Sequence, residues 1–360
     1  MINFWLEKGV AGFRIDAIMN IAKDLTFPGL PAEAPDGMCS AAKMTAKLSD
    51  EAATFLHEMN NATFKKHGAI SVAEAFGVNP ESLRNYIGKD GFFSTIFDFS
   101  ARELNEKYPA YYRYRPVSIA KWRDTIFASQ ERVNDIGFMC PIIENHDEPR
   151  GVSYYLPRHA QNADGAKAFG AVNVLLRGMP FIYQGQEIGM TNTRFDSIYE
   201  FDDVSAKDNY KVALKAGFSE RQALDILNIE SRDNARTPVL WSDEKNAGFS
   251  SAQITWLKVH QDYKNLNVRA QQNDPDSTLA FYQKLIALKN NEPYHDILTD
   301  GKFVALEPQA EYVVPFAREL NGKQIQVIAN FEDSAIVHKV SPNAQVVLSS
   351  KSVEIKDNQI

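Results

Sequence analysis

The chain has 360 residues, 44% hydrophobic and 24% charged, which is enough for one large domain and a small one. Its formal net charge of −7 predicts no nucleic-acid partner and no attraction to an anionic membrane. Two distant cysteines, Cys39 and Cys140, argue against a disulfide framework and indicate a reducing compartment. Glu7 and Lys8 interrupt the N-terminal apolar run, and no uncharged apolar run reaches about 18 residues. We therefore expect a soluble, cytoplasmic protein with no membrane partner.

Short apolar segments alternate with amphipathic ones along most of the chain, a pattern typical of strand–helix units around a parallel sheet. We expect strands at 12–16, 69–74, 95–99, 141–147 and 180–184. We expect helices at 40–66, 119–133, 164–177 and 277–289. Residues 193–270 are rich in Asp, Asn, Arg, Gly and Ser, and there we expect a long irregular insertion with only short helices.

After Pro293 the pattern changes to short segments in which apolar and polar residues alternate, as in strands with one buried face. We expect strands at 302–307, 312–318, 324–330 and 344–348, with Asn321-Gly322 as a hairpin turn. The predicted domains are therefore an α/β portion at 1–292 and a small antiparallel all-β domain at 293–360.

Ionisable residues follow four successive predicted strands, at Asp16, Glu74, Asp98 and Asp147. In a barrel of parallel strands, this is the edge at which catalytic residues gather. One carboxylate after a strand is more often a helix cap or an ion-pair partner than a catalyst. Four in succession favour a catalytic site.

Three of these carboxylates suit glycosidic cleavage with retention. That reaction needs one ionised and one protonated carboxyl group about 5 Å apart, and a third can stabilise the oxocarbenium-like transition state. Asp16, Glu74 and Asp147 provide three such groups. Arg14 lies two residues before Asp16, so it shares a strand face with Asp16 and would keep it ionised. His146 is a suitable donor to a sugar hydroxyl.

Three segments resemble signatures of the α-amylase superfamily (glycoside hydrolase family 13) in the family's order: GFRID at 12–16, VAEAFGV at 72–78 and ENHDEPR at 144–150. Two more resemble the branch of oligo-1,6-glucosidases, dextran glucosidases and α-glucosidases: GMPFIYQGQEIGMTN at 178–192 and SRDNARTPVLW at 231–241. The resemblance extends from Phe4 to the C-terminal β domain.

The resemblance implies a role for each matched carboxylate. Asp16 would be the nucleophile, Glu74 the acid/base and Asp147 the transition-state stabiliser. The predicted activity is release of glucose from the non-reducing ends of short α-1,4- or α-1,6-glucosides, with disaccharides and oligosaccharides as the binding partners.

The resemblance also implies a closed pocket for one glucose. Arg14 and His146 would line the subsite of the cleaved glucose, and Arg232 or Arg236 would contact its distal hydroxyls. Ala17 follows the nucleophile where branch members that cleave α-1,6 links usually carry Val, which favours α-1,4 links; core packing explains Ala17 equally well. Ala73 replaces a Gly that usually precedes the acid/base, and one methyl should be tolerated.

By motif order, the five predicted strands correspond to strands four to eight of a (β/α)8 TIM barrel. The expected fold is thus a partial barrel followed by the β domain. The family's first three strands and its metal-binding loop have no counterpart here, so we expect no cofactor and no bound metal. An unclosed barrel exposes two sheet edges. We therefore expect the chain alone to be poorly soluble or inactive, with a separately encoded N-terminal fragment as a possible partner.

Two alternatives remain open. A transglycosylase or sucrose isomerase would use the same covalent intermediate, although the arginine-rich isomerase segment is not found between Phe99 and Glu144. A non-catalytic relative, or a fragment of a decayed gene, would share the fold without the activity. The three retained carboxylates argue against a long-standing loss of catalysis.

Overall fold

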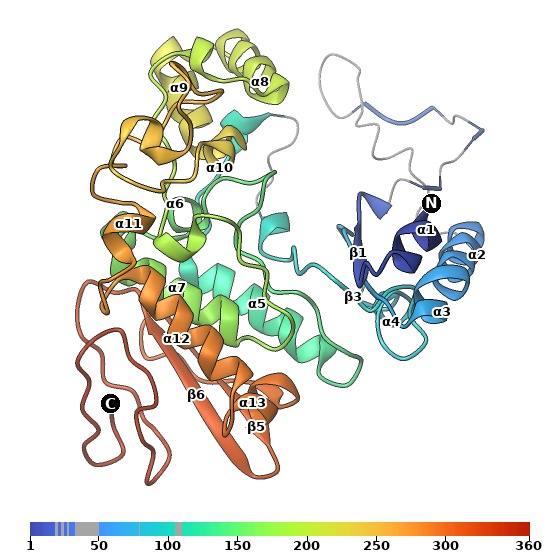
Figure 1. Ribbon diagram of the computed structural model, residues 1–360, viewed down its shortest axis with the longest axis vertical. Coiled ribbons are helices and arrows are strands. Elements are labelled where there is room, and N and C mark those ends of the chain that lie inside the picture. The colour runs from blue at the N-terminus through green and yellow to red at the C-terminus, as the bar shows by residue number, and fades with distance from the viewer. Residues whose placement is uncertain (19–20, 23–24, 27–28, 33–49, 79, 105–109) are drawn as a thin grey trace. The chain divides into compact units, whose positions relative to one another are not determined.

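A computed structural model describes residues 1–18, 21–22, 25–26, 29–32, 50–78, 80–104 and 110–360 (Figure 1). The chain divides into two compact units, residues 1–103 with 132–140 and residues 104–131 with 141–360. The predicted domain boundary after residue 292 falls inside the second unit and stays a prediction. In the described residues, no helix is long and apolar enough to span a membrane.

The first unit is built on a parallel sheet of three strands. They are β1 (Gly12–Ile15), β2 (Ile70–Ala73) and β3 (Thr95–Ile96), in the order β1-β2-β3. The sheet confirms the first three predicted strands and the parallel arrangement, although each strand is shorter than expected. Gly12 is required because a β-carbon there would lie 2.2 Å from the Ile70 carbonyl oxygen on the neighbouring strand.

Helices cover this sheet. They are α1 (Ile2–Glu7), α2 (Asp50–Met59), the π-helix η3 (Asn60–Phe64), α3 (Lys65–His67) and α4 (Leu83–Tyr86). The run α2–η3–α3 confirms the later part of the helix predicted at 40–66; residues 40–49, and Cys39, lie outside the described residues. The run ends at Gly68, whose φ of 61° is left-handed. Leu56, Phe92 and Ile96 are buried in the core beneath it.

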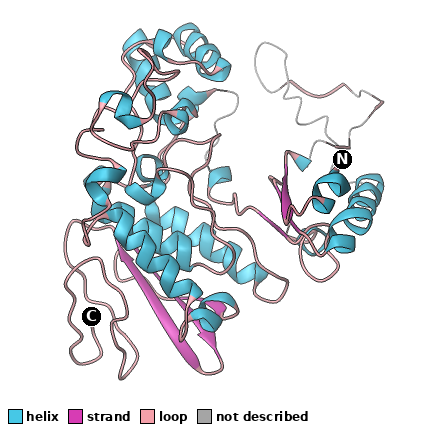
Figure 2. Ribbon diagram, viewed as in Figure 1, coloured by secondary structure: helices cyan, strands magenta, loops and turns pink. Residues whose placement is uncertain are grey.

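Figure 2 shows that helices dominate the second unit. Its α-helices are α6 (Gly151–Tyr155), α7 (Ala163–Leu175), α8 (Val204–Lys215), α9 (Glu220–Glu230), α10 (Asp233–Arg236), α11 (Val268–Gln271), α12 (Thr278–Asn290) and α13 (His295–Thr299). Its 3-10 turns are η5 (Tyr111–Arg113), η6 (Arg158–Ala160), η7 (Gln186–Ile188), η8 (Ile198–Glu200) and η9 (Lys245–Gly248). Two helices run across the division: η4 (Arg102–Leu104) and α5 (Ile119–Val133).

Side-chain caps explain where the main helices begin. The Asn162 side chain accepts bonds from the amides of the second and third residues of α7, and the Ser277 side chain accepts one from the third residue of α12. The helices predicted at 119–133, 164–177 and 277–289 are confirmed to within two residues.

The insertion at 193–270 holds longer helices than predicted, and that expectation was wrong. α8 has 12 residues and α9 has 11. A capping box of Ser219 and Gln222 starts α9. Leu227 of α9 packs with buried Phe195 and Phe201. Burial in the tertiary structure therefore stabilises helices that the polar composition of this segment did not predict.

The strands predicted at 141–147 and 180–184 are not strands in the structure. The two segments lie side by side, since the Phe181 amide donates to the Pro141 carbonyl at 2.9 Å, but no ladder forms. Pro141 and Pro180 have no amide hydrogen to donate. The structure therefore shows a mixed α/β fold, and the partial barrel stays a prediction.

The C-terminal sheet is antiparallel, with β4 (Lys302–Ala305), β5 (Val313–Leu320) and β6 (Lys323–Asn330) in that order. Asn321 and Gly322 have φ of 50° and 76°, which confirms the predicted hairpin. The strand predicted at 344–348 was wrong: this segment has no ladder partner among the described residues, and Val346 and Val347 are exposed.

Two buried basic side chains join this sheet to the helices. Lys289 of α12 donates to the carbonyls of Val174 and Leu176 at 2.7 and 3.1 Å, and Arg318 of β5 donates to the Leu175 carbonyl at 3.1 Å. These carbonyls end α7 and lack helical partners. The two side chains therefore cap α7 and fix its end against α12 and β5.

Candidate active site

The first unit carries a cluster of Arg14, Asp16 and Glu74. Because Ile15 pairs with Ala73 in the parallel register of β1 and β2, the next residues of both strands emerge at the same sheet edge. Arg14 Nη1 contacts Asp16 Oδ1, and Arg14 Nη2 lies 2.7 Å from Glu74 Oε1. One guanidinium therefore holds both carboxylates, which confirms the predicted shared face of Arg14 and Asp16.

The two carboxylates lie in different surroundings. The side chain of Asp16 is 75% exposed, whereas that of Glu74 is 10% exposed. The Ala17 amide donates to Glu74 Oε2 at 3.0 Å, and the Ile18 amide donates to the Glu74 carbonyl. Ala17 has φ of 42°, a left-handed conformation that is uncommon outside glycine. Its backbone, which sequence reasoning did not consider, thus fixes Glu74 beside the turn that carries Asp16.

Asp98 has a local structural role. Its Oδ1 accepts bonds from the Ser100 amide and hydroxyl at 3.2 and 2.6 Å, a turn that the side chain closes on its own backbone. Of the four strand-end carboxylates, this one fits the capping interpretation.

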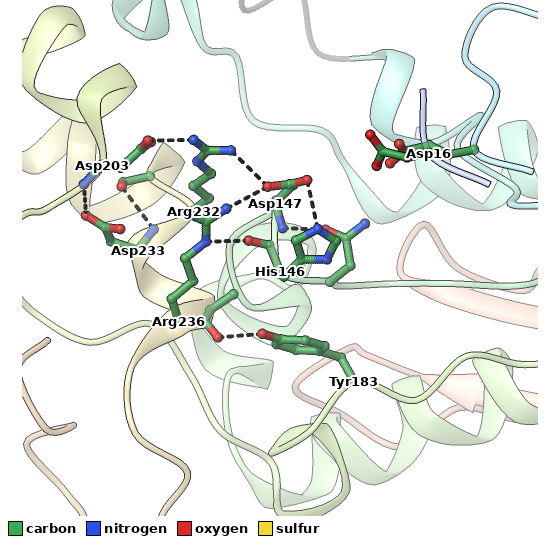
Figure 3. A network of polar contacts seen from close by, with 12 residues as sticks. Asp16, His146, Asp147, Tyr183, Asp203, Arg232, Asp233 and Arg236 are labelled. Carbon is green, nitrogen blue, oxygen red and sulfur yellow. Dashed lines mark hydrogen bonds and ion pairs between the residues drawn. The ribbon is translucent and has the colours of Figure 1, made fainter. Parts of the chain in front are cut away.

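The second unit carries a cluster around Asp147 (Figure 3). Asp147 Oδ1 accepts bonds from Arg232 Nη1 at 2.9 Å and Arg236 Nη2 at 2.7 Å. His146 Nε2 lies 3.1 Å from Asp147 Oδ2, and the His146 carbonyl accepts a bond from Arg236 Nε at 2.8 Å. The structure therefore brings together the four predicted residues of this unit.

Sequence reasoning missed the residues that hold Arg232. Its Nη2 donates to Asp203 at 2.8 Å, and Asp203 is buried. The amides of Asp202 and Asp203 both donate to the buried carboxylate of Asp233. The hydrogen bond to Asp203 is the main reason that the Arg232 pKa is raised. Asp203 lies in the polar insertion, where no motif distinguishes it from its acidic neighbours.

A buried ion pair closes the loop that carries His146 and Asp147. Glu144 and Arg150 are fully buried, with Glu144 Oε1 at 2.9 Å from Arg150 Nη1, and Glu144 Oε2 accepts the Gly151 amide at 2.6 Å. Burial raises the Glu144 pKa, opposed by the charge of Arg150. Inside the loop, the Asp147 amide donates to Asn145 Oδ1 at 2.8 Å.

Metal binding has no support in the described residues, where no group of three or more His, Cys, Asp or Glu side chains is arranged to hold an ion. The prediction that no cofactor is bound stays a prediction.

Residues 1–301 match the family model of the α-amylase catalytic domain. The chain belongs to the α-amylase family. It is 34% identical to a probable oligo-1,6-glucosidase 3 of Bacillus subtilis, over 92% of this chain and 58% of that protein. It is 32% identical to the oligo-1,6-glucosidase of Parageobacillus thermoglucosidasius, over 100% of this chain and 63% of the relative.

Among solved structures, the chain resembles the isomaltulose synthase of Protaminobacter rubrum. The TM-score is 0.87 at 28% identity, over 99% of this chain and 64% of the synthase. The chain thus spans between 58% and 64% of the length of these three proteins.

Proposed function

We propose that this chain carries the catalytic groups of a retaining α-glucosidase, which releases glucose from the non-reducing ends of short α-glucosides. One observation carries the proposal: Arg14 binds the carboxylates of both Asp16 and Glu74. Retention requires two carboxyl groups about 5 Å apart, one to attack the anomeric carbon and one to exchange a proton with the leaving oxygen. A shared guanidinium keeps the two carboxylates close together. Family membership supports the same chemistry.

In the proposed mechanism, Asp16 attacks the anomeric carbon while Glu74 protonates the departing oxygen. The bond between the anomeric carbon and the leaving oxygen breaks as a covalent bond to Asp16 forms. Glu74 then takes a proton from a water molecule, which attacks the same carbon and returns Asp16 to its ionised form. Two inversions retain the α configuration.

The second cluster would serve the sugar ring. Asp147 would stabilise the positive charge that develops on the ring, and its two arginines hold the carboxylate in one orientation. His146 and Arg236 would donate to sugar hydroxyls. Charged donors and acceptors of this kind suit the hydroxyls of a terminal glucose.

The substrate class is that of the curated relatives, whose names specify oligo-1,6-glucosidases. Ala17 favours the α-1,4 link instead. We therefore propose disaccharides and short oligosaccharides with either link as substrates in the cytoplasm, and a comparison of kcat/KM for maltose and isomaltose decides between the links.

We also propose a protein partner that supplies further barrel strands. Among the described residues, β1 pairs with β2 alone, and Phe4 and Trp5 on α1 are about half exposed. An unpaired sheet edge beside exposed aromatic side chains favours association with another strand. Coexpression of this chain with the part of the Parageobacillus relative that it does not cover tests whether solubility and activity rise together.

Covalent labelling tests the catalytic proposal. The chain, alone and with the complementing fragment, is incubated with 5-fluoro-α-D-glucosyl fluoride and digested for mass spectrometry. We expect a glucosyl adduct on Asp16, lost in Asp16→Asn and kept in Asp98→Asn, the matched strand-end control. An adduct on another residue, or β-glucose as the first product in proton NMR, contradicts the proposal. The absence of any adduct in both forms favours the non-catalytic alternative.

The likeness to isomaltulose synthase supports a second candidate, a sucrose isomerase or transglycosylase. Both start from the same covalent intermediate and differ in whether water or a sugar hydroxyl attacks it. Product analysis with sucrose separates them: glucose and fructose indicate hydrolysis, and isomaltulose indicates isomerisation.

A further inference from the structure

We propose that Tyr183 is a positioning residue for Asp147, coupling the loop that carries Asp147 to the helix that carries its two arginines. The expected effect on catalysis rests on the proposed function, whereas the structural coupling does not.

The loop of residues 144–150 has a rigid base. The Glu144–Arg150 pair closes it at 2.9 Å, and Arg150 Nη1 also donates to the Gln184 carbonyl at 2.7 Å. The Arg150 amide donates to Asn192 Oδ1 at 2.9 Å. The two bonds of the Arg150 guanidinium are charge-assisted and largely shielded from water, so they hold the base of the loop strongly.

Tyr183 lies between this base and α10. The guanidinium carbon of Arg150 lies 5.1 Å from the centre of the Tyr183 ring, a cation–π contact. The Tyr183 hydroxyl donates to the Ala235 carbonyl at 3.0 Å (Figure 3). One side chain therefore joins the buried pair to α10.

The bond to Ala235 matters because α10 is only four residues long. Arg232 is its N-cap and Arg236 its last residue, and both bind Asp147 Oδ1. A single turn has little stability of its own, and the Ala235 carbonyl is among those that a helix end leaves without a partner. Without the tyrosine hydroxyl, α10 loses a fixed point relative to the loop, and misplacement by about 1 Å can reduce catalysis about 100-fold.

Tyr183→Phe tests the coupling, with Tyr282→Phe as the matched control. Tyr282 is buried and its hydroxyl accepts a bond from Gln186 Nε2 at 2.9 Å, so each variant deletes one tyrosine hydroxyl bond. Hydrogen exchange by mass spectrometry follows peptides that cover 231–237 and 144–150. We expect exchange about tenfold faster in these peptides for Tyr183→Phe and unchanged exchange for Tyr282→Phe. Equal exchange in both variants overturns the coupling.

Kinetics test the consequence. With an aryl α-glucoside, we expect Tyr183→Phe to lower kcat about 10- to 100-fold with KM changed less than about threefold, while Tyr282→Phe keeps kcat. Faster exchange with unchanged kcat overturns the positioning role. If the wild-type protein shows neither turnover nor covalent labelling, that result counts against the proposed function, and the catalytic part of this inference is lost. The hydrogen-exchange experiment then still decides whether Tyr183 couples the loop to α10.

Discussion

Arg232 binds Asp147 with one guanidinium nitrogen and Asp203 with the other, at 2.9 and 2.8 Å. The two carboxylates come from distant segments, and Asp203 is the buried one, with 2% of its side chain exposed. Asp203 therefore fixes the direction from which Arg232 approaches Asp147. The arrangement makes the polar insertion at 193–270 part of the candidate site.

Asp203→Asn should lower the free energy of unfolding by about 1–3 kcal/mol. The substitution removes the charge that Arg232 Nη2 contacts while leaving the site buried, so a charge-assisted bond becomes a weaker neutral one. Asp202→Asn is the control, because Asp202 is exposed, and there we expect a change within about 0.5 kcal/mol. Urea unfolding measures both; equal losses would contradict the role of Asp203.

His260 should make the protein less stable in acid. Burial lowers the pKa of His260 to about 4. The Asp262 amide donates to Nδ1, which suits a neutral ring. Between about pH 6.5 and 4 the unfolded chain binds a proton at this histidine that the native chain does not, so stability falls as pH falls, by up to about 3 kcal/mol. Urea unfolding between pH 7 and 4 should show a shallower loss for His260→Gln; an unchanged slope would contradict this.

Lys289 should change the stability in the same direction as His260, but at higher pH. Burial, with the nearby charge of Arg318, lowers the pKa of Lys289 to about 7, against about 10.4 in the unfolded chain. From pH 7 upward the unfolded chain holds a proton that the native chain has released, so stability rises with pH. Urea unfolding between pH 7 and 9.5 should show this rise, and Lys289→Met should remove it. If the stability of the variant rose with pH by the same amount, the rise would come from other titratable groups.

Gly170→Ala should destabilise the contact of α7 with α12. In an exposed helix the change would add about 1 kcal/mol of stability. Here the new β-carbon would lie 2.5–2.6 Å from ring atoms of buried Tyr282, so we expect a net loss of about 1–3 kcal/mol. Combination with Tyr282→Leu should recover part of the loss in a double-mutant cycle measured by thermal unfolding. Additive losses would contradict the contact.

Local rules explain what could be predicted. Strands β1 and β2 form where the apolar pattern predicted them, and the sequence placed Arg14 beside Asp16 because strand side chains alternate. The starts of α7 and α12 depend on Asn162 and Ser277, whose side chains accept bonds from amides two or three residues further along the chain. The Asn321-Gly322 hairpin required only residues that adopt positive φ.

By itself, the sequence determined the candidate groups: two carboxylates after adjacent strands, a third in the ENHDEPR segment, and the arginines of the SRDNAR segment. Only the tertiary structure decided which residues hold them in place. Asp203 forms an ion pair with Arg232, Arg150 pairs with Glu144 at the base of the loop, and the Tyr183 hydroxyl donates to a carbonyl of α10. The tertiary structure also decided that 141–147 and 344–348 form no strands. The reason is physical: hydrogen bonds between residues far apart in the chain depend on burial and partner geometry, which spacing along the sequence does not encode.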